Sequence, residues 1–88
     1  MLRITQVNGP DRVPTLRLEG KLRGPWVEVL SRVCSELSRG EPRVIRLDLS
    51  AVTFLDEAGT RLLRALMRGG AAVTASGFVA ELLRREDR

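Results

Sequence analysis

The residue types on which most enzymes and metal sites depend are scarce in this chain. It contains no histidine and a single cysteine, Cys34, so the commonest metal sites and nucleophile–base pairs lack candidates. Four aspartates and seven glutamates could supply paired carboxylates, but most lie next to arginines, a pattern typical of solvated surfaces. The glycines form neither a Walker loop nor a G-x-G-x-x-G turn. We therefore predict no enzymatic activity, no metal and no cofactor.

The most distinctive polar segment is Asp56-Glu57-Ala58-Gly59, which follows an apolar run and opens an amphipathic stretch. Asp56 is a good N-cap residue, and Gly69-Gly70 is a typical helix stop. Glu57 lies in the first turn, where the helix dipole favours an acid, and it precedes Arg61 in the favourable i, i+4 orientation. We expect the working surface of the protein to lie at this corner between a strand and a helix.

The elements that position this corner follow from apolar periodicity and from turn residues. The expected elements, in chain order, are strands at 2–7 and 16–19, a helix at 25–38 stopped by Gly40, a strand at 44–49, a helix at 56–68, a strand at 71–75 and a short helix capped by Ser76. Residues 50–55 are expected to lead from the central strand to the second helix. The first two strands can pair antiparallel, while the later crossovers imply parallel pairing. The prediction is one α/β domain over residues 1–88, with the order β-β-α-β-α-β-α.

Both long helices show an apolar face that should pack on the sheet. In the first, this face consists of Trp26, Leu30, Val33, Cys34 and Leu37. In the second, the predicted buried stripe consists of Gly59, Leu62, Leu63 and Leu66, and the predicted exposed stripe of Glu57, Arg61, Arg64 and Arg68. The exposed stripe is either an ordinary solvated face or an electrostatic docking face for an acidic partner.

Around the corner the chain resembles the STAS family, the domain of anti-sigma-factor antagonists, stressosome components and the cytoplasmic parts of some transporters. The family pattern is a strand ending in D-L-S, then F-[LIM]-D-S-S-G and an apolar helix. Asp48-Leu49-Ser50, Phe54-Leu55-Asp56 and Gly59 match this pattern. Leu18-Glu19-Gly20-Lys21-Leu22 also resembles the L-x-G-x-[LI] end of the family's second strand. The resemblance implies a mixed sheet of about four strands packed by about three helices.

In antagonists of this type, the resemblance implies a switch in which a kinase anti-sigma factor phosphorylates the serine directly after the motif aspartate. That position is Glu57 here, and the second serine of the motif is Ala58. We therefore expect no phosphorylation at this corner. Glu57 either stabilises its helix or carries a permanent negative charge in place of a phosphate. The imitation would be partial, because a carboxylate has one negative charge and a phosphate has about two.

The partner-binding residues that the resemblance implies surround this corner: Asp56, Glu57, Ala58, Gly59, Thr60, Arg61 and Arg64. Asp56 would cap the helix, and Gly59 would permit close packing of the helix on the sheet. Thr60 and Arg61 depart from the hydrophobic and small residues usual in the family, and would add bulk and charge where a partner approaches. The chain also ends after its third helix, whereas family members commonly continue, so an exposed sheet edge would favour a homodimer or a covering partner.

The leading hypothesis is a non-enzymatic bacterial interaction module whose partner is a kinase-type anti-sigma factor. The first alternative is an accessory subunit that docks on the ATP-binding subunit of a membrane transporter. The second alternative is a domain that senses a small anion or a lipid, since a helix N-terminus favours anions, although Asp56 and Glu57 oppose one.

Composition supports an ordinary small globular domain. Of 88 residues, 43% are apolar and 30% charged, and the net charge of +4 comes from scattered arginines and one lysine. With only three aromatic residues and no groove-reading motif, we predict no nucleic-acid partner. No window is long and apolar enough for a membrane span, and residues 1–4 alternate too early for a secretory signal, so a cytoplasmic location is expected.

Overall fold

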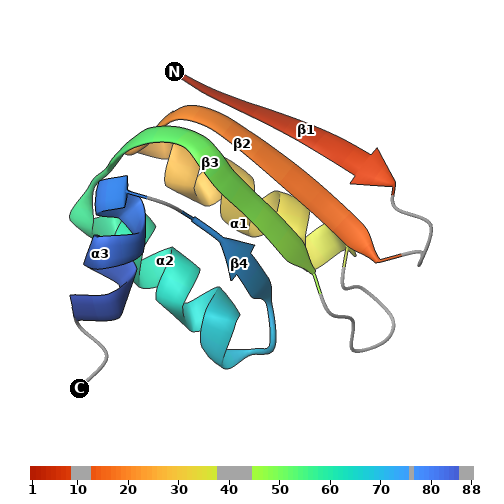
Figure 1. Ribbon diagram of the computed structural model, residues 1–88. Coiled ribbons are helices and arrows are strands. Elements are labelled where there is room, and N and C mark those ends of the chain that lie inside the picture. The colour runs from red at the N-terminus through yellow and green to blue at the C-terminus, as the bar shows by residue number, and fades with distance from the viewer. Residues whose placement is uncertain (9–12, 38–44, 76, 86–88) are drawn as a thin grey trace.

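A four-stranded sheet carries three helices in the part of the chain that the structure describes (Figure 1). The structure is a computed structural model, and it describes residues 1–8, 13–37, 45–75 and 77–85. The elements are β1 (Leu2–Asn8), β2 (Pro14–Leu22), α1 (Pro25–Leu37), β3 (Arg46–Leu55), α2 (Glu57–Arg68), β4 (Ala72–Thr74) and α3 (Gly77–Arg85). The predicted fold class and element order are confirmed.

The strands lie in the order β1-β2-β3-β4. β1 pairs antiparallel with β2, whereas β2 with β3 and β3 with β4 pair in parallel, as predicted. Parallel strands end at the same edge of a sheet, so β2, β3 and β4 bring their carboxyl ends to one side. The helices begin on that side, at the left of Figure 1. This side, which we call the carboxyl edge, contains the corner around Asp56.

Two strands are longer than apolar alternation indicates. β2 continues past Glu19 to Leu22, the residue at which the resemblance to the family motif placed the end of this strand. β3 continues past Leu49 to Leu55. The prediction that 50–55 are a connecting segment is therefore wrong. The pairing of β2 with β3 shifts register twice, as bulges do, so the buried residues Leu49, Val52 and Leu55 recur every third position instead of every second.

The first and last helices are close to their predicted positions. α1 begins at Pro25 as expected, and α3 spans the apolar residues assigned to the short helix. The proposed stop at Gly40, the cap at Ser76, the helix end at Ser38 and the strand start at residue 44 lie outside the described residues.

The core is aliphatic and lies on one face of the sheet. Strands and helices contribute one connected cluster of buried residues: Leu2, Leu16, Leu18, Leu22, Leu30, Cys34, Ile45, Leu47, Leu49, Val52, Leu55, Leu63, Val79 and Leu83. The rest of the predicted face of α1 packs partly buried against this cluster, and so do Leu62 and Leu66 of α2. Cys34 is buried, as predicted, and burial raises the pKa of its thiol to about 11, which keeps it protonated at neutral pH.

The opposite face of the sheet carries exposed polar side chains. Arg17 of β2 is exposed, and its Nε lies 3.6 Å from Oδ2 of Asp48 on β3. Oδ1 of Asp48 accepts hydrogen bonds from the backbone N–H and the hydroxyl of Ser50, at 3.0 and 2.7 Å. The hydroxyl bond of Ser50 is the main reason that the pKa of Asp48 is lowered. No helix in the described part of the chain is long and apolar enough to cross a membrane.

Gly59 lies where α2 approaches β2 most closely. A Cβ at this position would stand 2.9 Å from the carbonyl oxygen of Leu22 and 3.1 Å from Cγ of the same residue. Real Cβ atoms essentially never approach backbone this closely, so a side chain would force the helix away from the sheet. The prediction that Gly59 permits close packing of the helix on the sheet is confirmed.

Gly59→Ala should lower the free energy of unfolding by about 1 kcal/mol. Overpacking typically costs about 1–3 kcal/mol, which exceeds the gain of up to about 1 kcal/mol in helix propensity. Gly69→Ala is the matched control, because a Cβ there meets backbone only at 3.5 Å and φ is −82°. Urea denaturation followed by circular dichroism measures both variants. Equal stability of the two variants would contradict the close approach at Gly59.

Candidate functional site

Asp56 connects the corner to two other parts of the fold. It caps α2 with an extended backbone (φ −87°, ψ −179°), and its Oδ1 accepts a hydrogen bond of 2.7 Å from the N–H of Gly59. Its Oδ2 accepts a second bond of 2.9 Å from the N–H of Gly24, in the turn before α1. The backbone N–H of Asp56 donates to the carbonyl oxygen of Leu22 at 3.2 Å. One residue thus joins the end of β2, the start of α1 and the start of α2.

These contacts favour the ionised form of Asp56. The backbone hydrogen bond from Gly24 is the largest cause that lowers the pKa of its carboxyl group, followed by the bond from Gly59. The positive charge of Arg23 adds to the effect. Both carboxylate oxygens are occupied by backbone N–H groups, so Asp56 orders the corner instead of offering a free acid to a partner.

Thr60 faces inward. Its side chain is on the buried side of α2, with 8% of the residue exposed. Its hydroxyl and its backbone N–H both donate to the carbonyl oxygen of Asp56 at 3.0 Å. The hydroxyl therefore completes the first turn of the helix, while the role of Thr60 toward a partner stays a prediction.

Glu57, Ala58 and Arg61 are the predicted site residues that face solvent. The side chains of Glu57 and Arg61 are 80% and 72% exposed, and Arg61 Nη2 lies 2.8 Å from Glu57 Oε2. The i, i+4 pairing predicted from the sequence is confirmed. Exposed pairs of this type contribute only a few tenths of a kcal/mol, so the charges remain available to a partner at small cost.

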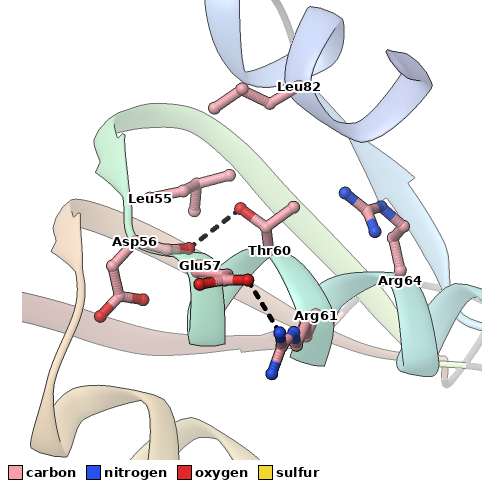
Figure 2. A pocket seen from close by; sticks show the side chains of 7 residues that line it. All are labelled: Leu55, Asp56, Glu57, Thr60, Arg61, Arg64 and Leu82. Atoms are coloured by element: carbon pink, nitrogen blue, oxygen red, sulfur yellow. Dashed lines mark hydrogen bonds and ion pairs between the residues drawn. The ribbon is translucent and has the colours of Figure 1, made fainter. Parts of the chain in front are cut away.

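A pocket of about 380 Å³ opens beside the corner, between α2 and α3 (Figure 2). It is lined by Leu55, Asp56, Glu57, Thr60, Arg61, Arg64 and Leu82. Five of the seven predicted site residues therefore meet at one surface. The other two are Gly59, buried under the helix, and Ala58, exposed in its first turn.

Arg64 departs from the predicted exposed stripe. It is half-buried, and its Nε and Nη2 atoms are shielded from solvent. Its position on α2 is one turn after Thr60, which directs it toward the pocket (Figure 2). The stripe prediction treated α2 as a helix against a sheet alone, whereas α3 also contacts α2.

Three residues of this surface were missing from the sequence prediction. Gly24 supplies a backbone donor to Asp56, while Leu55 and Leu82 supply apolar walls of the pocket. Leu55 lies directly before Asp56 in the family motif, so the sequence did contain a signal that this residue lies close to the site. The roles of Gly24 and Leu82 depend on tertiary contacts between distant segments, for which a single sequence contains no signal.

Asp56→Ala should lower the free energy of unfolding by about 2 kcal/mol at pH 7, because the helix loses its cap and the N–H of Gly24 loses its acceptor. Since the pKa of Asp56 is lowered in the folded state, its contribution is fully present above the unfolded value of about 3.9 and is lost as the pH falls through the folded value.

The test is urea denaturation of the wild type and Asp56→Ala between about pH 7 and pH 3. The difference between them should be constant down to about pH 5 and then shrink. Asp56→Asn, which keeps one acceptor oxygen without the charge, should be intermediate at neutral pH. A difference that stays constant to low pH would show that the charge of Asp56 does not stabilise the corner.

Several solved structures share this fold. The anti-sigma factor antagonist SpoIIAA in its unphosphorylated form has a TM-score of 0.69 and 15% identity, over 93% of this chain and 82% of that chain. An antisigma-factor antagonist STAS domain from Rhodobacter sphaeroides has a TM-score of 0.61 and 20% identity, over 89% and 88% of the two chains. An uncharacterized protein from Shewanella loihica PV-4 with a SpoIIAA-like fold has a TM-score of 0.61 and 17% identity, over 96% and 75%.

The TM-scores show a common fold, although the sequences are at most 20% identical. No curated protein matches the sequence. The family model described as the STAS domain matches residues 5–83, a range that includes all the strands apart from the start of β1, the first two helices and most of α3. The chain therefore belongs to the STAS domain family.

Proposed function

We propose that this chain is a regulatory, non-enzymatic interaction domain of the anti-sigma-factor-antagonist type, which acts in the bacterial cytoplasm. Its partner would be a kinase-type anti-sigma factor that binds the corner at Asp56. The observation that carries the proposal is the geometry of Asp56, whose carboxylate fixes the start of α2 and leaves Glu57 and Ala58 facing solvent. Two structures with this fold are those of anti-sigma factor antagonists, which supports the assignment.

We propose further that binding at this corner is not switched by phosphorylation. The two positions where the family motif has serines are occupied by Glu57 and Ala58, which have no hydroxyl group. The hydroxyl of Thr60, in the same turn, is not a substitute, because it is buried and donates to the carbonyl oxygen of Asp56. A kinase would have to open the first turn of α2 to reach it.

Glu57 would keep the surface in its binding state instead of imitating a phosphate. Its single charge is paired with Arg61, so a partner meets a nearly neutral ion pair at this position. A phosphate at this position would have about two negative charges, which the single positive charge of one guanidinium group cannot balance. The proposed result is an antagonist that binds constitutively and is regulated by its abundance or at another surface.

The chain should bind its anti-sigma factor equally well with and without ATP, and its intact mass should not change when the kinase is active. Glu57→Ser should restore an acceptor hydroxyl, gain the mass of one phosphate and then bind about tenfold more weakly, a change of ~1.4 kcal/mol. The purified kinase-type anti-sigma factors encoded by the same genome are the partners to test, by calorimetry and mass spectrometry.

Glu36→Ser is the matched control, because Glu36 is an exposed acid in α1 but lies in the helix's last turn, away from the carboxyl edge. It should neither be phosphorylated nor lose affinity. Phosphorylation of the wild type with release of the partner would overturn the regulatory proposal. Binding to a transporter ATP-binding subunit, with none to any kinase-type anti-sigma factor, would overturn the proposed partner.

A further inference from the structure

In the described part of the chain, β1 is the longer of the two strands at the edges of the sheet. It lies at one end of the strand order and β4 at the other, and Figure 1 shows it at the rim of the described structure. β4 has three residues, whereas β1 has seven. An edge strand presents a row of backbone N–H and C=O groups with which another chain can pair. The outer edge of β1 is therefore a candidate interaction surface outside the corner at Asp56.

Half of the backbone groups of β1 point away from β2. The N–H of Lys21 donates to the carbonyl oxygen of Met1 at 3.1 Å, and the two strands continue in regular register from the pair of Leu2 with Gly20. Hydrogen-bonded pairs alternate with non-hydrogen-bonded pairs in an antiparallel ladder. The odd-numbered residues of β1 therefore bond to β2, and the even-numbered residues direct their N–H and C=O groups to the outer edge.

β1 itself lacks the features with which edge strands usually discourage the addition of another strand. Such features include proline, lysine, bulges, a very short length and charged side chains that point inward. β1 contains neither proline nor lysine, its pairing with β2 has no register shift, and the side chains on its core face are Leu2, Ile4 and Gln6. Its one charged residue, Arg3, lies on the opposite face across from Glu19 of β2, which has the opposite charge. A further strand could therefore pair here without meeting an unbalanced charge.

The side chains of β1 match those of a second, antiparallel copy of the same strand. Met1 and Val7 are exposed apolar residues, at 88% and 37%, and Ile4 lies midway between them in the sequence. A two-fold axis at Ile4 would place Met1 opposite Val7 of the second copy at both ends of the junction. At the centre the half-buried Ile4 would lie opposite its own counterpart, and Arg3 opposite Thr5. This register joins the even-numbered residues by hydrogen bonds and sets no like charges directly opposite each other.

We infer that β1 is a homodimerisation edge, at which two copies of this chain join their four-stranded sheets into one continuous sheet. A second copy supplies by symmetry an apolar residue for each exposed one, which an unrelated strand would provide only by chance. The inference does not depend on the proposed function, because the pocket and the hydrogen bonds of Asp56 involve β2, β3, the helices and the turn before α1. Each dimer would carry two such corners.

Gln6→Pro tests the edge without breaking the pairing of β1 with β2. The N–H of Gln6 points outward, so proline removes a donor from the outer edge only, and edge strands tolerate proline at such positions. Sedimentation equilibrium should show a reversible dimer for the wild type and a dissociation constant at least about tenfold higher for this variant. Gln6→Ala keeps the N–H and is the matched control, whose dissociation constant should stay within about twofold of the wild type.

Cysteine crosslinking tests the register. Arg3 and Thr5 are both exposed, and in the inferred dimer they form a non-hydrogen-bonded pair with Cα atoms about 4.5 Å apart. Disulfides join Cα atoms that are about 4.4–6.8 Å apart. Arg3→Cys mixed with Thr5→Cys should therefore form a disulfide-linked dimer under mild oxidation. Neither variant should do so alone, because its two new cysteines would lie about 8 Å apart, two positions out of register.

Cys34 does not interfere with this reaction, because its thiol is buried and protonated at neutral pH. A wild type that stays monomeric at every concentration would overturn the inference and leave the proposed function untouched. A dimer that Gln6→Pro does not weaken would show that another surface joins the copies. Crosslinking of Thr5→Cys by itself would place the two-fold axis at Thr5, contrary to the inferred register. If circular dichroism shows that Gln6→Pro does not fold, the cysteine mixture decides the question.

Discussion

The arrangement of the site depends on the two hydrogen bonds accepted by the carboxylate of Asp56. One comes from Gly24, in the turn before α1, and the other from Gly59 in α2, so the side chain of Asp56 ties the start of its own helix to a turn that lies 32 residues earlier in the chain. An N-cap aspartate accepts a hydrogen bond from a backbone N–H in the first turn of its own helix. Here the second oxygen also fixes the neighbouring turn, which sets the spacing between two helix starts at the carboxyl edge of the sheet.

The close approach of α2 to β2 determines which side chains of the first turn remain free. With Gly59 against the carbonyl oxygen of Leu22 and Thr60 directed inward, the helix is fixed in rotation about its axis. Glu57, Ala58 and Arg61 are then the residues turned to solvent. The same contacts that stabilise the fold therefore determine which side chains of this turn are exposed, and they direct its one hydroxyl, that of Thr60, inward.

Sequence patterns within one or two helical turns were enough to predict the residues around Asp56. The roles of the residues farther from Asp56 depend on contacts between segments that are distant in the sequence. The cap at Asp56, the stop at Gly69 and the pair of Glu57 with Arg61 each follow from residues within one or two helical turns, and all were predicted. The continuation of β3 to Leu55 was missed because bulges break the period of two on which strand prediction depends. The burial of Arg64 and the role of Leu82 follow from contacts of α3, whose place beside α2 leaves no local trace in the sequence.

The position of Trp26 has a consequence for how the protein can be observed. It is the only tryptophan in a chain without tyrosine, and it lies in the first turn of α1, two residues after the glycine that Asp56 holds. The intrinsic fluorescence of the protein therefore originates at the carboxyl edge, where Trp26 packs partly buried against the aliphatic core. Its emission reports the environment of the first turn of α1 without an added label, whereas circular dichroism follows the helices and strands of the whole domain.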